Sequence, residues 1–128
     1  MTDHILIVDD EQQTLDLLRI MLRPLNRPIE SVMNGHDTLI SVEYNPPRVI
    51  LLDFMLPDMT GLEVCTRLKA DASAAHIPVI FYTASHDKII ETQAQDAGAD
   101  YFLRKPATRA MLCETIETAL RKTLPSDA

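Results

Sequence analysis

The stretch Ile5-Leu6-Ile7-Val8-Asp9-Asp10-Glu11 joins an unbroken apolar run to three consecutive acids. Continuous aliphatic runs of this length are typical of strands buried on both faces of a parallel sheet. A carboxylate directly after such a strand lies at the edge of the core, where its charge is costly without a partner. The stretch therefore predicts a buried strand that ends in an acidic site.

Four further apolar runs follow, each of strand length. They span residues 29–32, 49–52, 79–82 and 101–103. The first includes Glu30 and Ser31 and is predicted to be an edge strand, whereas the other three are nearly continuous and suit buried strands.

Between the runs, apolar residues recur at the 3–4-residue spacing of amphipathic helices. The four clearest sets are Leu15, Leu18, Leu22 and Leu25; Leu62, Cys65 and Leu68; Ile90, Ala94 and Ala97; and Leu112, Ile116, Ala119 and Leu120. Residues 36–44 are predicted to form a less regular helix. Gly98 is predicted to cap the C-terminal end of the helix that contains Ile90, Ala94 and Ala97. Alternating strands and helices predict an α/β fold, a doubly wound five-stranded parallel sheet covered on both faces.

Length and charge restrict the function further. The chain has 128 residues and 12 Lys and Arg against 19 Asp and Glu, a formal net charge of −7. We expect one domain over 1–124 and a short tail at 125–128. The acidic balance argues against direct nucleic-acid binding. No stretch suits a membrane span or signal peptide, so a cytoplasmic protein without membrane contact is expected.

The cysteines and histidines suggest no site. Cys65 and Cys113 form no C-x-x-C pair and lie on apolar helix faces, which predicts buried, inert thiols. The four histidines show no metal-ligand spacing and are predicted to be surface or loop residues.

Polar residues follow four of the predicted strands. They are Asp9 and Asp10 after the first strand, Asp53 after the third, Thr83 after the fourth and Lys105 after the fifth. Because sites in doubly wound sheets form at the carboxyl ends of the strands, these side chains are expected to converge. Three close carboxylates repel one another and need a cation, and all-oxygen ligands favour Mg²⁺. Asp53 then has the properties of a nucleophile for phosphoryl transfer.

Four motifs, in order and at strand ends, carry a family resemblance over most of the chain. They are ILIVDDE (5–11), LLDFMLPDMTG (51–61), PVIFYTA (78–84) and GADYFLRKP (98–106). With them the chain resembles a response-regulator receiver domain, the phosphoacceptor of two-component signalling. The resemblance implies a flavodoxin-like (βα)5 fold with strand order 2-1-3-4-5.

The resemblance also implies roles for individual residues. Asp53 matches the phosphorylated aspartate, and Asp9 and Asp10 match the acidic pair that holds Mg²⁺ with Asp53 and the main-chain carbonyl of Met55. Lys105 matches the lysine that pairs with the phosphoryl group.

A second set of matched positions belongs to the switch. Thr83 corresponds to the switch hydroxyl and Ala84 to a small neighbour that lets a side chain pass. Phe102 is at the aromatic switch position, where the family often has Tyr, and Pro106 often follows a cis peptide bond.

The function implied is a phosphorylation-activated switch rather than an enzyme, although such a domain catalyses its own phosphorylation and dephosphorylation. The phosphoryl donor would be a sensor histidine kinase or a phosphotransfer protein. The surface of the fourth helix, fifth strand and fifth helix would then control a downstream effector domain or protein, and a phosphorylation-linked homodimer is compatible with this.

Simpler interpretations exist for each motif alone. Asp9 and Asp10 suit the start of a helix, Thr83 suits a strand-to-helix turn, and Phe102 suits a core. Among other classes, a haloacid-dehalogenase-type phosphohydrolase would have a second aspartate at Met55, and a flavodoxin-like binding module would have a Ser/Thr/Gly-rich phosphate loop after the first strand. A pseudo-receiver scaffold would not need the complete acid, threonine and lysine set.

Overall fold

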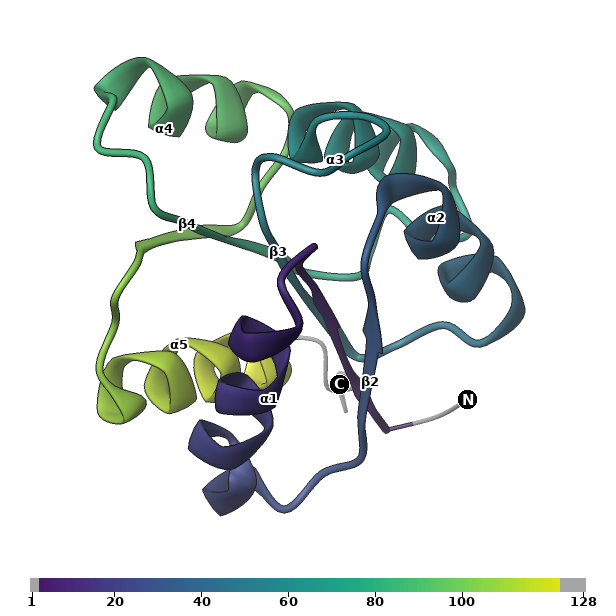
Figure 1. Cartoon of the computed structure of the whole chain (residues 1–128). Coiled ribbons are helices and arrows are strands. Elements are labelled where there is room, and N and C mark those ends of the chain that lie inside the picture. Colours follow the sequence, from purple (N-terminus) through teal and green to yellow (C-terminus); the bar gives the residue numbers. More distant parts are fainter. Residues whose placement is uncertain (1–2, 123–128) are drawn as a thin grey trace.

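Five short strands form one parallel sheet at the centre of the computed structural model, which describes residues 3–122 (Figure 1). The strands are β1 (Ile5–Val8), β2 (Ile29–Val32), β3 (Val49–Leu52), β4 (Val79–Thr83) and β5 (Tyr101–Arg104). The predicted tail at 125–128 and the domain boundary at residue 124 lie outside the described residues.

The strand order is β2-β1-β3-β4-β5, which confirms the predicted doubly wound topology and places the strand with Glu30 at an edge. The register of the central strands pairs Val8 of β1 with Leu52 of β3, and Leu52 with Phe81 of β4. The carboxyl ends of β1, β3 and β4 therefore reach one rim. β5 is the other edge strand, and its four residues are only half-buried because no strand within residues 3–122 covers its outer side.

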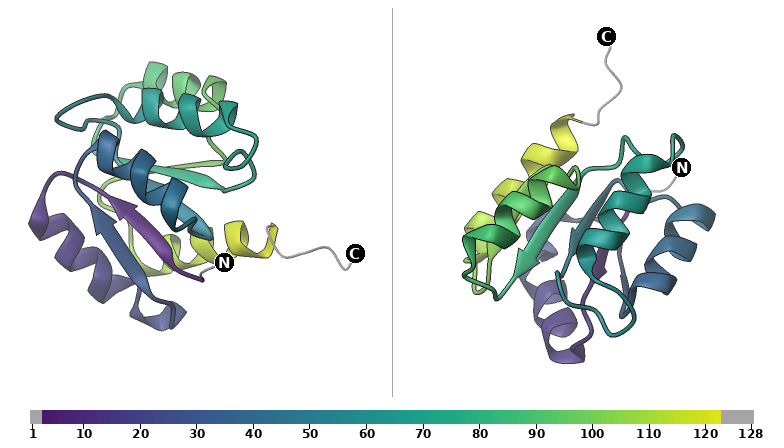
Figure 2. Two further views of the ribbon diagram at one scale, coloured as in Figure 1. Left: turned by 90° about the vertical axis from the view of Figure 1, so that its right-hand side faces the viewer. Right: turned by 90° about the horizontal axis from the view of Figure 1, so that it is seen from above.

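Helices cover both faces of the sheet, as predicted (Figures 1 and 2). They are α1 (Gln12–Met21), α2 (Gly35–Tyr44), α3 (Gly61–Ala70), α4 (Lys88–Asp96) and α5 (Arg109–Lys122). The helices α1 and α5 pack on one face and α2, α3 and α4 on the other. Within residues 3–122, none of the helices combines the length and apolarity needed to cross a bilayer.

Alternate residues of the central strands divide the core into two layers. In β1, Ile5 and Ile7 pack toward α1 and α5, whereas Leu6 and Val8 pack toward α2, α3 and α4. Both faces are apolar because both are covered, which explains the continuous runs in the sequence.

The first predicted helix ends earlier than its leucine spacing suggests. Leu25 does not continue α1 but lies in a separate 3₁₀ turn, Arg23–Leu25. The break coincides with Pro24, which lacks an N–H and clashes with the preceding turn of an α-helix. Asn26, in the left-handed conformation (φ 53°), then turns the chain toward β2.

Two predictions on single residues were wrong. His4 is not a surface or loop side chain, because it is only 2% exposed. Its carbonyl accepts from Arg48 N–H at 2.9 Å, so the backbone at His4 already pairs with the segment that leads into β3. Cys113 is only half-buried, with Sγ 3.5 Å from the Met21 carbonyl, whereas Cys65 is fully buried as predicted.

Gly98 ends α4 as predicted. Its φ of +101° is one that only glycine adopts freely, and its N–H donates to the Gln95 carbonyl at 3.0 Å.

Candidate functional site

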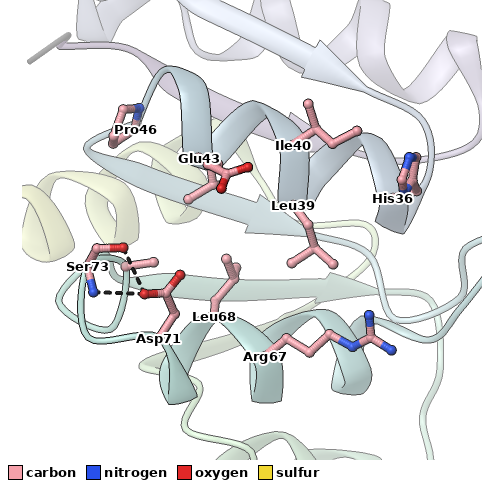
Figure 3. Close-up of a pocket in the computed structure, with 11 residues that line it drawn as sticks. His36, Leu39, Ile40, Glu43, Pro46, Arg67, Leu68, Asp71 and Ser73 are labelled. Atoms are coloured by element: carbon pink, nitrogen blue, oxygen red, sulfur yellow. Dashed lines mark hydrogen bonds between the residues drawn. The ribbon is translucent and has the colours of Figure 1, made fainter.

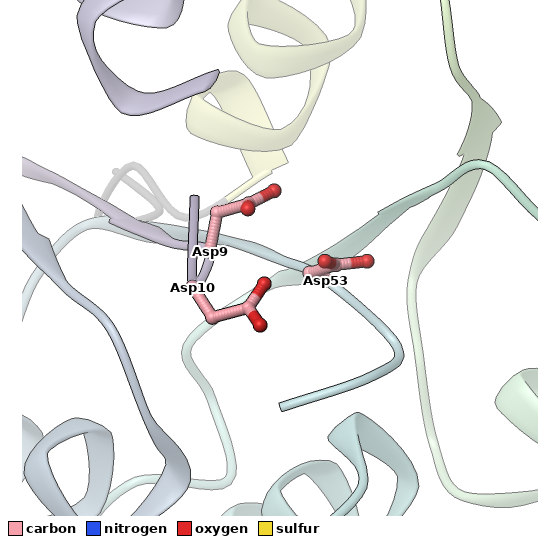
Figure 4. Close-up of side chains that lie close together, drawn as sticks. All are labelled: Asp9, Asp10 and Asp53. Atoms are coloured by element: carbon pink, nitrogen blue, oxygen red, sulfur yellow. The ribbon is translucent and has the colours of Figure 1, made fainter. Parts of the chain in front are cut away.

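Three aspartates meet at the rim where β1 and β3 end (Figure 4). Asp9 follows β1, and Asp53 follows β3 with its N–H donating to the Val8 carbonyl at 3.0 Å. One carboxylate oxygen from each of Asp9, Asp10 and Asp53 lies within 4.8 Å of the others. Asp9 is 1% exposed, Asp53 is half-buried and Asp10 is exposed, so the cluster runs from the core edge to solvent.

Lys105 reaches the same cluster from the end of β5. Its Nζ lies 2.6 Å from Asp9 Oδ2 and 3.6 Å from Asp53 Oδ2. Its N–H donates to the Thr83 carbonyl at 2.7 Å, and the bond from Lys105 to Pro106 is cis, as the family resemblance implied. Burial of the ammonium lowers its pKa, but the hydrogen bond to Asp9 and the charges of Asp53 and Asp9 outweigh burial and raise it. Lys105 is therefore a fixed positive charge at this rim.

Asp53 has the perturbed acidity expected of a group at the edge of a core. Burial raises the pKa of its carboxyl from 3.8 to about 6, and the charges of Asp9 and Asp10 act in the same direction. Lys105 and the Phe54 N–H, which donates to Asp53 Oδ1 at 2.8 Å, oppose the rise without cancelling it. The carboxylate of Asp53 is therefore stabilised by any additional positive charge.

The donor set fits a magnesium ion. The cluster has three carboxylates and one ammonium, which pairs with two of them, so negative charge is in excess, and its ligand atoms are all oxygens. Hard divalent cations prefer such ligands, and Mg²⁺ commonly uses few protein carboxylates and keeps several waters. Asp9, Asp10 and Asp53 are the side chains that could hold the ion.

Thr83, predicted as the switch hydroxyl, ends β4 and is buried. Its Oγ1 accepts from Ser85 N–H at 3.3 Å, which holds the hydroxyl in the turn that leads toward α4. Ala84, between them, is exposed. The predicted small neighbour thus lies in the turn that carries the hydroxyl.

Phe102, predicted as the aromatic switch, is half-buried on β5. Its ring centroid lies 6.5 Å from that of Phe81, and the Arg104 guanidinium lies over the Phe102 ring, 5.0 Å from the ring centroid. Arg104 Nη1 in turn lies 3.3 Å from Glu91 Oε1 of α4. Phe102 thus connects the core to the surface formed by α4 and β5.

A separate hollow of about 420 Å³ lies between α2 and α3 (Figure 3). His36 and Arg67 line one end of it and Asp71 and Ser73 the other. None of the side chains predicted for the site is among its lining residues in the described part of the chain.

Sequence reasoning missed one contact near the site. Asp58 accepts from the N–H groups of Gly35 and His36, both at 2.8 Å, and so ties the loop after Asp53 to α2. The acid in the loop motif was the available signal, but its partners lie more than 20 residues upstream, and no local pattern identifies them.

Sheet topology and rim chemistry together define the CheY-like class of α/β domains. The signal receiver domain of a histidine kinase from Syntrophus aciditrophicus superposes with a TM-score of 0.90 at 27% identity, covering 98% of this chain and 95% of that chain. A CheY-like receiver domain protein from Methanospirillum hungatei superposes with a TM-score of 0.87 at 26% identity, covering 95% of this chain and 96% of that chain.

Sequence comparison identifies the family. The family model described as response regulator receiver domain matches residues 5–117, and the chain therefore belongs to that family, whose members are phosphorylation switches of two-component signalling. It is similar to the response regulator PleD of Caulobacter vibrioides, with 35% identity over 127 residues, 99% of this chain and 28% of that protein. For the DNA-binding response regulator MtrA of Mycobacterium tuberculosis the identity is 32% over 122 residues, 95% of this chain and 52% of that protein. The chain thus spans about a quarter to a half of these relatives.

Proposed function

We propose that this domain accepts a phosphoryl group on Asp53 from a sensor histidine kinase or a phosphotransfer protein, with Mg²⁺ bound beside it. The observation that carries the proposal is the convergence of Asp9, Asp10, Asp53 and Lys105 at one rim, with the ammonium 2.6 Å from Asp9 and 3.6 Å from Asp53. A half-buried carboxylate can attack an anionic phosphoryl group where positive charge offsets the repulsion, and here the Lys105 ammonium and a magnesium ion, when bound, would supply that charge.

Asp53 provides the nucleophile. Its Oδ1 accepts from the Phe54 N–H, and its Oδ2 faces Lys105. A carboxylate oxygen of Asp53 forms the new bond to phosphorus while the phosphorus–nitrogen bond of the donor phosphohistidine breaks, and the electron pair stays on the imidazole nitrogen. In dephosphorylation, water attacks phosphorus and releases inorganic phosphate and the Asp53 carboxylate.

Lys105 and the acidic pair prepare the rim for this transfer. The ammonium of Lys105 neutralises phosphoryl oxygens as a compact point charge. Asp9, Asp10, Asp53 and the main-chain carbonyl of Met55 would hold the magnesium ion, which when bound supplies positive charge to the phosphoryl oxygens. The excess of carboxylates over ammonium groups supports this assignment.

We further propose that phosphorylation changes the surface of α4, β5 and α5. The added group carries roughly −1.5 to −2 charges at neutral pH. It attracts Lys105 and the Thr83 hydroxyl, the turn containing Ala84 moves with Thr83, and Phe102 repacks toward the vacated space. Phe102 supports this role because it contacts both the core ring of Phe81 and Arg104 of the outer surface.

The output surface would control an effector domain or a separate protein. Ile89 of α4 is 63% exposed, an apolar side chain suited to a partner contact. Because the chain belongs to the response regulator receiver family, we expect phosphorylation to change how this surface binds its partner. That partner could be a second copy of this chain, in a phosphorylation-linked homodimer.

The proposal is tested by incubating the purified chain with acetyl phosphate and magnesium and measuring its intact mass. We expect uptake of one phosphoryl group, loss of uptake with EDTA, and no uptake by Asp53→Asn. Asp16→Asn, an exposed aspartate of α1, is the matched control and should take up phosphate normally. Phosphorylation of Asp53→Asn to the wild-type extent would contradict the proposal.

A further inference from the structure

The loop between β3 and α3 is attached at its tip to a different helix. Asp58 Oδ1 accepts from Gly35 N–H and Oδ2 from His36 N–H, both at 2.8 Å. These are the first two peptide groups of α2, whose N–H donors have no acceptor within the helix. One carboxylate thus makes two charge-assisted hydrogen bonds to a helix N-terminus, a favourable arrangement for a negative charge.

Capping of α2 does not require Asp58. Asn34 is the N-cap residue of α2, and its Oδ1 accepts from Asp37 N–H at 2.7 Å. The helix therefore has a local cap of the usual kind. The added contribution of Asp58 is to fix the loop, not to start the helix.

Packing reinforces the same attachment. A Cβ atom at Gly35 would overlap the side chain of Met59, the residue after Asp58. The loop tip and the first turn of α2 are therefore in direct contact, and a side chain at position 35 would push them apart.

The base of the loop is closed on the site side. Met55 and Thr60 form an isolated antiparallel bridge, and Gly61 N–H donates to the Phe54 carbonyl at 2.6 Å. Thr60 also caps α3 by accepting from Glu63 N–H at 3.2 Å. The segment between Met55 and Thr60 is thus a closed turn, with Asp58 near its tip.

Side-chain packing does little to hold Met55, because this side chain is 61% exposed. Its backbone is held by the bridge to Thr60, within the turn that Asp58 attaches to α2. Met55, two residues after Asp53, and Asp58 therefore belong to one closed turn that is attached to α2 at its tip.

We propose that Asp58 is a positioning residue for the magnesium site: it anchors the turn on α2 and so directs the Met55 carbonyl toward the acidic cluster. This inference rests on the proposed function, because it assigns a part to the Met55 carbonyl in holding the ion. Groups that orient metal ligands from outside typically contribute about 10–100-fold to affinity.

The test compares Asp58→Ala with Asp71→Ala by magnesium titration calorimetry on the folded proteins. Asp71 is the matched control, because its Oδ1 also accepts two hydrogen bonds, from Ser73 N–H at 3.0 Å and Ser73 Oγ at 2.8 Å (Figure 3). It follows the carboxyl end of α3, so the ten-residue helix separates it from the loop by about 15 Å.

We expect Asp58→Ala to raise the Kd for magnesium by roughly tenfold. Asp71→Ala should bind magnesium as the wild type does, although both variants lose stability. Saturating magnesium should restore the acetyl phosphate reaction of Asp58→Ala, which a general loss of structure would not permit. Should Asp58→Ala fail to fold, Asp58→Asn, which keeps one acceptor oxygen, should still show a weaker Kd.

Wild-type magnesium affinity in whichever of these two Asp58 variants folds would overturn the inference and leave the proposed function intact. A wild-type chain that binds no magnesium would instead contradict the proposed function itself. The two failures are therefore distinguishable in one set of titrations.

Discussion

Replacement of Asp53 by asparagine is expected to stabilise the metal-free protein at neutral pH. The wild-type side chain is 13% exposed and ionises in a setting where burial and two neighbouring aspartates oppose its charge. Asparagine has nearly the same shape, keeps an oxygen to accept from the Phe54 N–H, and carries no charge. The substitution therefore removes an electrostatic penalty while it abolishes the proposed phosphorylation.

The size of the effect follows from the pKa of Asp53, which is about 6 in the folded chain against 3.8 for the free group. The folded state holds the proton more tightly, so unfolding becomes easier as the pH rises. The penalty develops between about pH 4 and pH 6 and is complete above that range. At about 1.4 kcal/mol per pKa unit, it reaches about 3 kcal/mol near pH 8 and about half of that at pH 5.

Urea denaturation in EDTA, followed by circular dichroism at pH 8 and pH 5, measures this difference in unfolding free energy. Asp53→Asn should exceed the wild type by up to about 3 kcal/mol at pH 8, and the gap should shrink at pH 5. Asp16→Asn, the exposed control, should change stability by less than about 0.5 kcal/mol. Magnesium should stabilise the wild type more than the variant. A variant of equal or lower stability at pH 8 would refute this account of the Asp53 environment.

Three other substitutions or modifications test separate parts of the structure. Lys105→Met leaves buried carboxylates without their ammonium and should cost about 2–3 kcal/mol in EDTA, measured by urea denaturation, with partial recovery in magnesium; unchanged stability would contradict the ion pair. Gly61→Ala places a methyl group against the Asp53 carbonyl, so it should lower the free energy of unfolding by at least about 2 kcal/mol and slow the acetyl phosphate reaction. A variant with wild-type stability and rate would contradict this close packing. Burial raises the pKa of both thiols, that of Cys65 to about 11, and Cys65 is fully buried whereas Cys113 is half-buried. Iodoacetamide at pH 8 should therefore alkylate Cys113 first, as peptide mass spectrometry would show, and equal labelling of the native protein would contradict the packing of α3.

The acidic rim could be predicted from the sequence because it depends only on where the strands end. Apolar runs identified the strands, and in a parallel sheet the residues that follow the strands converge whatever the loops do. Asp9, Asp53 and Lys105 could therefore be placed together although 96 residues separate the first from the last. The same argument places the buried Thr83 at the end of β4.

Features that depend on how separate segments meet could not be predicted. The bond from Asp58 to α2 requires the loop and the helix to approach in space, and the burial of His4 depends on its place beside the backbone of Arg48. Pro24 indicated that α1 ends early, but the leucine spacing continued through Leu25 and predicted a longer helix. The contacts of Phe102 with Arg104 likewise follow from side-chain directions on an edge strand.

Identification of the phosphorylated residue tests the central claim most directly. The chain would be phosphorylated with acetyl phosphate and magnesium, then reduced with borohydride, which converts an aspartyl phosphate to homoserine, and its peptides sequenced by tandem mass spectrometry. The acidic rim predicts homoserine at position 53, with Asp9 and Asp10 recovered unchanged. Homoserine at Asp9, at Asp10 or at any aspartate away from this rim would contradict the assignment of Asp53 as the phosphoacceptor.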